Sequence, residues 1–469
     1  MALNLATLAL LTLLIGTAGG GAWLIRRQRG GWRVVGIILV LEALILLAAQ
    51  YLLSTFPIGI GEPLIRVPFI ALLAQTLGIL LAIGAVVALL LLIGRRIRYL
   101  IDQQLRRRWL IGGMLLLLPI LAGASMVVMW KTSIPLRERE RDPSKRDISL
   151  SEGFEWSIYA QGTIDNPTAI AFGPDGRLYI ADIAGDLWVG TDTNSDFSID
   201  TITRWAGGFD LLVGVVWHQD ELFAASSGKI EALRDSDNDG VADQRRTVVD
   251  GLPSLILRPH SNNGLAIGPD GRLYFGVGST TDGLTESEPL AASILSVNPD
   301  GSDLKVYARG IGNSFDVAFN QAGALFGGDN GPSRDPNSSE DPPDEFNFYA
   351  EDQHYGYPYF YGDPPKNGGT RSALVSFPAH SVPTGVTFYA GDTYPPDYRD
   401  SAFITLWQRG EIAHIEVGST PSGDYLARST TFGSGFLYPI DVITGPDGNL
   451  YVADFGTSAI YRITYGGAR

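Results

Sequence analysis

The chain has 469 residues, no cysteine and a formal net charge of −15 at pH 7. Without cysteine it can form no disulfide, zinc–thiolate site or catalytic thiol. The charge is divided unevenly, because residues 1–150 hold 17 basic and 7 acidic side chains while the remainder hold 18 and 43. The strong negative charge of residues 151–469 argues against binding to nucleic acid or to anionic membrane surfaces. It favours the binding of cations.

Four long apolar stretches fill the first 130 residues, at about 2–25, 34–54, 68–94 and 109–130. Each is long enough to cross a bilayer as a helix. Arginines crowd the loops after the first and third stretches, whereas the only charged residues after the second are Arg66 and Glu62. The positive-inside rule then places both chain ends outside the cytoplasm. We predict a transmembrane bundle of four α-helices over residues 1–130 of a multi-pass cell-membrane protein, with the C-terminal domain on the extracytoplasmic side.

The next segment, residues 131–150, mixes charges of both signs without apolar periodicity and contains Pro135 and Pro143. Such a composition is typical of a linker. The C-terminal domain is therefore expected to begin at residue 151.

One motif returns three times in residues 151–469. It reads FGPDGRLY at 172–179, IGPDGRLY at 267–274 and TGPDGNLY at 444–451. In each copy an apolar strand enters Pro-Asp-Gly, where proline presets φ for a turn and glycine accepts a positive φ, and an alternating strand follows. Each copy is therefore predicted to be a β-hairpin.

Degenerate copies of the motif fill the gaps, at 209–226, 314–328 and 384–417. With them, repeats begin near 167, 210, 262, 314, 383 and 438. A spacing of about 45 to 70 residues suits a four-stranded propeller blade with its loops. The fold class predicted for residues 151–469 is an all-β, six-bladed β-propeller.

Two acidic loops place oxygen-bearing side chains at alternate positions. The first supplies Asp235, Asp237, Asp239 and Asp243, with Gly240 at its turn. The second runs from Asp192 to Asp200. Because such spacing lets one tight loop wrap carboxylates around a hard cation, both loops are candidate calcium sites. A solvated polar turn is the alternative for each.

His260 lies in LRPHSNNG, the segment that leads into the third repeat. Loops that enter the innermost strands of a propeller surround one mouth of its channel. A histidine there is a candidate general base. A capping or packing histidine is the alternative.

Turn residues, acids and aromatics are interleaved after residue 326, in GGDNGP (327–332), DEFN (344–347) and YGYP (355–358). A long irregular excursion inside a compact repeat is commonly functional. Carbonyls at the Gly-Pro bend can coordinate a hard cation, and the tyrosines offer flat faces for sugars or aromatic cofactors. An aromatic loop that packs on itself is the alternative.

Residues 151–466 resemble the soluble aldose dehydrogenases that depend on pyrroloquinoline quinone (PQQ), and the related sorbosone dehydrogenases. The resemblance rests on His260 before a GPDG hairpin, on the three motifs of the excursion, and on ARGIGN (308–313), PTGVTFY (383–389) and WQRG (407–410). It implies a propeller whose channel mouth holds PQQ and Ca²⁺. His260 would take the proton of an aldose hydroxyl while hydride passes to the quinone.

By the same resemblance, the carbonyls of Gly331 and Pro332 are calcium ligands, and Asn313 and Arg409 join them in binding the cofactor. The implied function is a membrane-anchored, extracytoplasmic quinoprotein that oxidises aldoses or related aldehydes. Membrane quinone is then a candidate electron acceptor.

The chain departs from this family where cationic side chains hold the PQQ carboxylates. Gly312 replaces an arginine before Asn313, Gln408 replaces a lysine before Arg409, and Tyr438 and Ile440 stand where arginines are found. Each lost charge-assisted hydrogen bond costs roughly 1.5 to 3 kcal/mol. The candidates to compensate are Arg258, Arg334 and Arg409.

The alternative function is a calcium-stabilised propeller that has lost PQQ. It would serve as a binding module or as a lactonase-like hydrolase. A hydrolase would use channel carboxylates around a catalytic Ca²⁺, and the candidates are Asp316, Asp329 and Asp441.

Overall fold

The computed structural model describes residues 141–254, 262–333, 340–365 and 369–467. The predicted transmembrane bundle, Arg258, His260 and Arg334 lie outside these residues. Among the described residues, no helix has the length and apolar character needed to cross a membrane.

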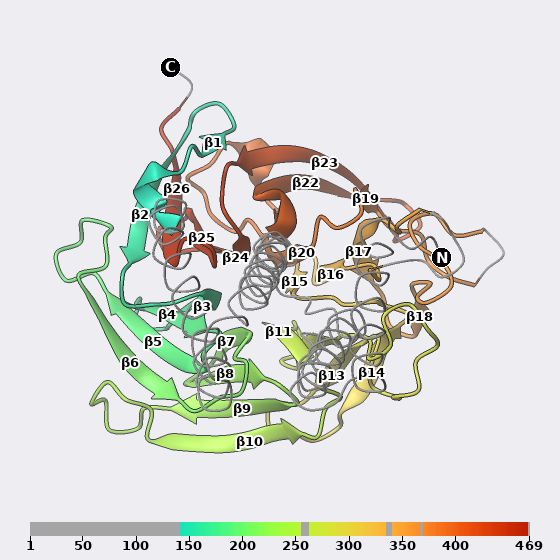
Figure 1. Cartoon of the computed structure of the whole chain (residues 1–469), viewed down its shortest axis with the longest axis horizontal. Helices are drawn as coiled ribbons and strands as arrows, with labels where there is room; N and C mark the ends of the chain where they lie inside the picture. Colours follow the sequence, from blue (N-terminus) through green and yellow to red (C-terminus); the bar gives the residue numbers. More distant parts are fainter. Residues whose placement is uncertain (1–140, 255–261, 334–339, 366–368, 468–469) are drawn as a thin grey trace, which may run out of the picture. The chain divides into compact units, whose positions relative to one another are not determined.

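Six sheets surround a central channel, so the predicted six-bladed β-propeller is confirmed (Figure 1). The first three blades take their strands in chain order from the channel outward. Blade 1 comprises β3 (Pro167–Phe172), β4 (Leu178–Asp182), β5 (Asp186–Thr191) and β6 (Thr201–Gly207). Blade 2 comprises β7 (Gly214–His218), β8 (Glu221–Ser226), β9 (Lys229–Arg234) and β10 (Gln244–Asp250). Blade 3 comprises β11 (Asn262–Ile267), β12 (Leu273–Val277), β13 (Ser293–Val297) and β14 (Lys305–Arg309), with β18 (Gln353–His354) parallel to β14.

Blades 4 to 6 complete the ring, and blades 5 and 6 each include a strand from the start of the described residues. Blade 4 comprises β15 (Val317–Phe319), β16 (Leu325–Asp329), β17 (Asp344–Tyr349) and β19 (Val375–Phe377). Blade 5 comprises β20 (Pro383–Phe388), β21 (Ala402–Leu406), β22 (Glu411–Ser419) and β23 (Tyr425–Ser434), with β1 (Ser149–Leu150) at its edge. Blade 6 comprises β24 (Pro439–Thr444), β25 (Leu450–Asp454), β26 (Ala459–Tyr465) and β2 (Phe154–Gln161). Short 3₁₀ helices are η1 (Pro143–Lys145), η2 (Pro396–Tyr398) and η3 (Trp407–Arg409).

The innermost strands are β3, β7, β11, β15, β20 and β24, and each contacts the next around the ring. They begin at residues 167, 214, 262, 317, 383 and 439. These starts lie within four residues of the repeat starts predicted from the GPDG motif and its degenerate copies. The period of the sequence is therefore the period of the blades.

The ring is closed by pairing between a strand near the start of the described residues and the last strand of the chain. β2 pairs with β26 in an antiparallel register that runs from Phe154 opposite Tyr465 to Gln161 opposite Ala459. The preceding segment also packs on the propeller, because the guanidinium of Arg146 donates to the carbonyls of Gly435 (2.8 Å) and Phe436 (3.0 Å). An N-terminal strand in the last blade ties the first and last blades together.

The three GPDG copies form tight turns between the first and second strands of blades 1, 3 and 6, as predicted. Their second glycines have φ of 78°, 76° and 76°, the left-handed region that glycine adopts without strain. The motif's tyrosine bonds back to its aspartate: Tyr274 donates to Asp270 Oδ2 at 2.9 Å, and the other two copies repeat the contact. The spacing of four residues between aspartate and tyrosine in each copy thus specifies a turn that is stabilised by its own side-chain hydrogen bond.

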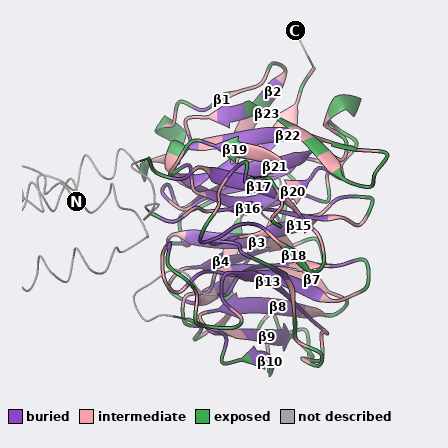
Figure 2. Cartoon of the chain, turned by 90° about the vertical axis from the view of Figure 1, so that its right-hand side faces the viewer, coloured by how far each residue is buried: buried purple, intermediate pink, exposed green. Residues whose placement is uncertain are grey.

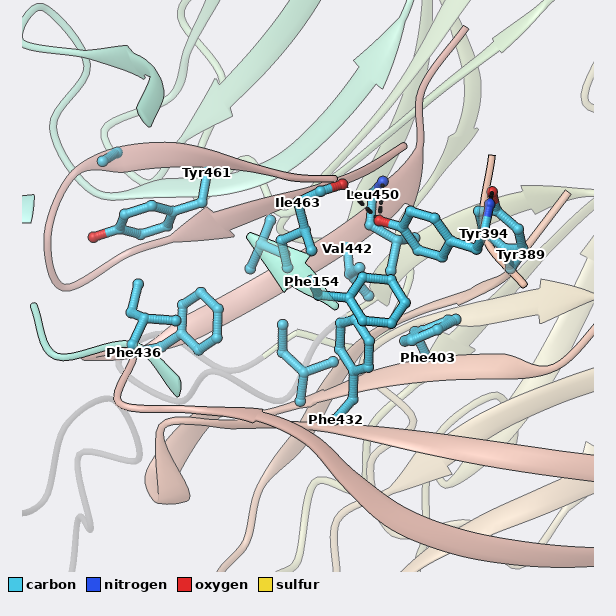
Figure 3. Close-up of a cluster of buried hydrophobic side chains, with 14 residues drawn as sticks. Phe154, Tyr389, Tyr394, Phe403, Phe432, Phe436, Val442, Leu450, Tyr461 and Ile463 are labelled. Carbon is cyan, nitrogen blue, oxygen red and sulfur yellow. Dashed lines mark hydrogen bonds between the residues drawn. The ribbon is translucent and has the colours of Figure 1, made fainter. Parts of the chain in front are cut away.

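Buried residues are concentrated along the strands, and exposed residues on the connecting loops (Figure 2). Between blades 5 and 6, the ring of Phe154 from β2 packs edge-on against Tyr394 and Phe432, each with a centroid distance of 4.8 Å (Figure 3). It also packs edge-on against Tyr398 at 5.2 Å. The closing strand therefore contributes an aromatic side chain to the core as well as backbone hydrogen bonds.

Candidate functional site

The channel mouth is the end of the channel at which the innermost strands begin and the second strands of the blades end. Asp329 ends β16 there, and its carboxylate accepts the backbone N–H groups of Gly312 (3.1 Å) and Asn313 (2.8 Å). Asp454 ends β25 and accepts the N–H groups of Leu437 (2.7 Å) and Tyr438 (3.1 Å) in the same way. Both acids thus hold the segment that enters the innermost strand of their own blade.

Asn330 follows Asp329 and connects three segments at the mouth. Its side-chain amide donates to the carbonyls of Asn313 (3.0 Å) and Pro383 (3.1 Å), while its Oδ1 atom is buried and has no hydrogen-bond partner. Asn313, a predicted cofactor ligand, is also buried, and its Oδ1 accepts from Asn263 at 2.8 Å. An unsatisfied amide oxygen therefore lies directly before the predicted calcium ligands.

The predicted calcium ligands Gly331 and Pro332 lie at the mouth, in a segment held by carboxylates at both ends. Gly331 N donates to Asp344 Oδ1, and Ser333 N donates to Asp282 Oδ1, each at 2.9 Å. Burial raises the pKa of Asp344 to about 6. The segment is fixed by acids and lies within an acidic part of the mouth.

Asp329 and Glu345 form a buried carboxyl pair that sequence reasoning did not identify. They are directly opposite each other in the β16–β17 register and are only 6% and 5% exposed. Burial raises the pKa of Glu345 to about 7, and burial together with the Glu345 charge raises the pKa of Asp329 well above its usual range. Glu345 accepts from Gly362 N and from Asn347 Nδ2, the latter at 2.9 Å. Asn347 Oδ1 is buried and has no hydrogen-bond partner.

A small cavity lies against this pair, and its volume of about 10 Å³ has room for one ion or water molecule. Asp329 and Glu345 line it together with Gly312 and Gly331, and the other wall is aromatic: Tyr355, Tyr357, Phe360 and Tyr361. The aromatic segment reaches blade 3, because Tyr355 N and Tyr357 N donate to the carbonyls of Arg309 and Gly310, at 2.9 Å each. The predicted excursion therefore crosses from blade 4 to blade 3 and forms one wall of the cavity.

The first acidic loop joins β9 to β10, at the end of the propeller opposite the mouth. Carboxylate oxygens of Asp235, Asp237 and Asp239 lie within 4.8 Å of one another, as a cation site requires. Asp243 instead accepts from Ser236 N (2.7 Å) and the Ser236 hydroxyl (2.6 Å). The structure thus brings together three of the four predicted ligands.

Arg409, predicted to bind the cofactor, lies in η3 at the mouth but is exposed. Its guanidinium forms a two-pronged ion pair with Glu411, with both N–O distances at 3.0 Å. Gln408 follows Trp407, whose ring stacks on Tyr438 at 5.1 Å. Neither Arg409 nor its neighbours offer an unpaired cation to an anionic ligand.

Asp316 and Asp441, the acids of the hydrolase alternative, connect blades. Asp316 Oδ2 accepts from Val386 N of blade 5 at 3.1 Å, and Asp441 Oδ2 accepts from Ile170 N of blade 1 at 2.8 Å. Burial raises the pKa of Asp441 to about 6, and burial with the Asp441 charge raises the pKa of Asp316 further from its usual value. These contacts give both acids a structural role in joining neighbouring innermost strands.

The described residues of the mouth offer oxygen ligands of the kind that a calcium ion binds, but they do not fit PQQ. Carboxylates and unsatisfied amide oxygens are the ligands that Ca²⁺ prefers. PQQ carries three carboxylates, and no lysine or arginine is among the described residues that line the cavity. At Gly312, where the resembling family has arginine, a Cβ atom would lie 2.5 Å from the carbonyl oxygen of Asn330. The position therefore has no space for a side chain.

A family model described as a domain of unknown function, DUF7133, matches residues 140–462. The chain belongs to this family. A relative from Borreliella burgdorferi, described as an uncharacterized protein, is 26% identical over 355 residues, which are 68% of this chain and 91% of the relative.

Solved structures of sugar dehydrogenases share the fold. A putative glucose dehydrogenase from Thermus thermophilus is 23% identical, with a TM-score of 0.55 over 66% of this chain and 100% of that chain. The holo PQQ domain of pyranose dehydrogenase from Coprinopsis cinerea is 16% identical, with a TM-score of 0.56 over 69% and 98%. PQQ-bound aldose sugar dehydrogenase from Streptomyces coelicolor is 18% identical, with a TM-score of 0.52 over 67% and 99%. These likenesses show the six-bladed fold.

Proposed function

We propose that the protein is a calcium-dependent, sugar-binding propeller whose ligand site is the channel mouth. The observation that carries the proposal is the Asp329–Glu345 pair, which is buried beside an aromatic wall and has no ion-pair partner among the described residues. Burying two carboxyls without a counter-charge is unfavourable unless a proton or a cation compensates. A bound cation compensates both groups at neutral pH.

Two unsatisfied amide oxygens favour a metal ion over a proton as the compensating charge. The Oδ1 atoms of Asn330 and Asn347 are buried without partners, and Asn347 lies two residues after Glu345 on β17. Ca²⁺ takes six to eight oxygen ligands, including carboxylates, amide oxygens and backbone carbonyls. Asp329 and Glu345 would hold the ion, with the carbonyls of Gly331 and Pro332 as the further ligands predicted from the sequence.

A sugar is the ligand class that suits the opening of the cavity, outside the space that an ion would fill. Its hydroxyls can bind Ca²⁺ and donate to carboxylates, and its apolar faces pack on aromatic rings such as those of Phe360 and Tyr361, which line the cavity and are half-buried. A neutral ligand avoids repulsion by the acids of the mouth. The sugar dehydrogenases of the same fold support this choice of ligand.

Oxidation of an aldose or related aldehyde with PQQ is the second candidate function. Its support is the PQQ-bound and holo propellers of the same fold, together with the match of His260, Asn313 and the Gly331–Pro332 bend. It ranks second because Gly312 and Arg409 do not provide the cations that the cofactor carboxylates need. It would require Arg258 and Arg334 to supply them.

We further propose the location implied by the first 130 residues. The four apolar stretches would anchor the chain in the cell membrane, and the arginine-rich loops would hold the propeller outside the cytoplasm. Ca²⁺ is abundant enough in that compartment to fill sites of modest affinity.

The test uses the purified full chain. Calcium is titrated while the melting temperature is followed, and glucose binding is then measured by calorimetry with Ca²⁺ or with a chelator. We expect Ca²⁺ to raise the melting temperature and glucose to bind only with Ca²⁺. Glu345→Gln should lose the glucose binding and the part of the rise in melting temperature that comes from the mouth. The exposed Glu416→Gln should lose neither.

A parallel titration with PQQ separates the two functions. No binding at micromolar PQQ supports the quinone-free propeller. Tight PQQ binding, with dye reduction by aldoses that disappears in His260→Ala, would replace it by the dehydrogenase. Glucose binding that ignores Ca²⁺ would remove the metal from the proposal.

A further inference from the structure

Two exposed apolar side chains belong to neighbouring loops at the channel mouth. Among the described residues, five large hydrophobic side chains are exposed, and two of them are Leu284 (60%) and Tyr359 (59%). They come from different blades' loops, yet the hydroxyl of Thr285, next to Leu284, hydrogen-bonds the Tyr359 hydroxyl at 2.9 Å. The Tyr359 ring is thus held by its polar end while its faces stay open to solvent.

The loop that carries Leu284 is held in a single arrangement from both sides. The buried Tyr357 hydroxyl accepts from Gly283 N and hydrogen-bonds the Ser279 hydroxyl, at 2.6 Å each. Glu286 accepts from the backbone and hydroxyl of Thr280, both at 2.6 Å. Burial opposes its charge, but these hydrogen bonds outweigh burial and hold the pKa of Glu286 below its usual value. The exposed pair is therefore presented by a rigid support.

The pair adjoins the proposed calcium segment but lies outside the cavity. Asp282, two residues before Leu284, accepts from Ser333 N at 2.9 Å, and Ser333 follows the Gly331–Pro332 bend. Tyr355, Tyr357, Phe360 and Tyr361 line the cavity, whereas Tyr359 from the same segment does not. A ligand at the opening of the cavity that extends along the rim would reach Tyr359 next.

We infer that Leu284 and Tyr359 form a second sugar subsite, so that the ligand is an oligosaccharide with one ring at the opening of the cavity and a neighbouring ring on Tyr359. This inference rests on the proposed function. Exposed aromatic surface gains from covering by the apolar face of a pyranose, and a ring already fixed by a hydrogen bond loses little entropy on binding. Contact with one such ring is expected to strengthen binding about two- to tenfold.

The test compares chain lengths in the full protein with Ca²⁺ present. Dissociation constants are measured by calorimetry for glucose and for gluco-oligosaccharides of two to four units, in α-1,4 and β-1,4 linkage. At least one linkage series should bind about two- to tenfold more tightly than glucose. Tyr359→Ala should erase this gain and leave the glucose constant unchanged, whereas Tyr359→Phe, which keeps the ring, should retain most of it. Leu426→Ala, at the 71%-exposed leucine of blade 5, is the matched control and should change nothing.

Failure of the inference is distinct from failure of the proposed function. If glucose binds with Ca²⁺ but neither linkage series binds better, or if Tyr359→Ala keeps the gain, the second subsite is overturned while the sugar site stands. If neither glucose nor any oligosaccharide binds, both the subsite and the sugar-binding function are overturned.

Discussion

Asp329 and Glu345 are opposite each other across β16 and β17, and each carboxyl is buried with backbone or amide donors in place of a cation. Because burial raises the pKa of Glu345 from its usual 4.5 to about 7, the folded protein keeps a proton that the unfolded chain releases. In a chelator, the contribution of Glu345 to the free energy of unfolding should therefore be complete below about pH 4.5 and be lost as pH rises to about 7. Denaturant unfolding between pH 4.5 and 8 measures this slope.

Glu345→Gln removes one titrating group and should reduce that slope. Asp344 and Asp441, whose pKa values are each raised from 3.8 to about 6, would still contribute, as would Asp316 and Asp329, whose pKa values burial also raises. A slope equal to that of the unmodified chain would show that Glu345 does not hold the proton.

Calcium should act most strongly where these carboxyls are ionised. Metal binding requires deprotonated ligands, so Ca²⁺ competes with the proton on Glu345. The calcium-induced rise in melting temperature should be larger at pH 8 than at pH 5.5, and at 100 times its dissociation constant Ca²⁺ should add about 2.7 kcal/mol. An equal rise at both pH values would place the ion on other groups.

The blades could be predicted from sequence because the information is local. Gly-Pro-Asp-Gly and the tyrosine that follows it specify a turn, the start of a strand and a side-chain hydrogen bond across the turn. The bond from the Tyr274 hydroxyl to Asp270 is an example. The closing strand was not predicted, because β2 has no repeat of its own and its partner β26 lies about three hundred residues away. The pairing of β2 with β26 follows from the order of the strands around the ring, and no local motif indicates it.

The site was predictable only in part for the same reason. Gly331 and Pro332 could be placed at the mouth from a motif, whereas the pairing of Glu345 with Asp329 follows from strand register. The DEFN motif (344–347) is visible in the sequence. Side chains alternate between the two faces of a strand, so assigning the motif to a strand would have placed Glu345 and Asn347 on one face. The carboxylate of Asp329 accepts two backbone N–H groups of the segment that enters its blade. Asp454 makes the same two contacts in blade 6, so a motif that contains an acid does not by itself distinguish a binding role from a structural one.

Gly312 should tolerate no side chain. A Cβ atom there would lie 2.5 Å from the Asn330 carbonyl oxygen, which is backbone and cannot move aside without shifting the mouth. Gly312→Ala should cost about 1 to 3 kcal/mol of stability and weaken Ca²⁺ binding. Gly418→Ala is the matched control, because a Cβ there meets no atom within 4 Å. Equal stability of the two variants in denaturant unfolding would contradict the close packing.

The acidic loop of blade 2 should bind calcium independently of the mouth. Asp235, Asp237 and Asp239 converge at the opposite end of the propeller, so the Asp237→Asn/Asp239→Asn variant should lose one of two calcium-binding events in calorimetry and keep calcium-dependent glucose binding. Asp397→Asn, an exposed acid of η2, serves as the control. An unchanged calcium stoichiometry would identify the loop as a solvated polar turn.

The closing strand should contribute strongly to stability through one side chain. Phe154 fills the space between Tyr394, Tyr398 and Phe432 at the junction of blades 5 and 6. Phe154→Ala leaves a cavity that these rings cannot collapse into without breaking the hydrogen bond from Tyr394 to the Ile463 carbonyl (2.6 Å), so it should cost about 3 to 5 kcal/mol. Leu426→Ala removes an exposed side chain on a neighbouring strand and should cost less than about 0.5 kcal/mol. Because β2 joins the first and last blades, the Phe154 variant should also exchange the amide protons of β26 faster than those of β12 in blade 3, the blade opposite blade 6 in the ring. Uniform exchange in all six blades would mean that the ring opens as a whole and that closure by β2 does not limit its stability.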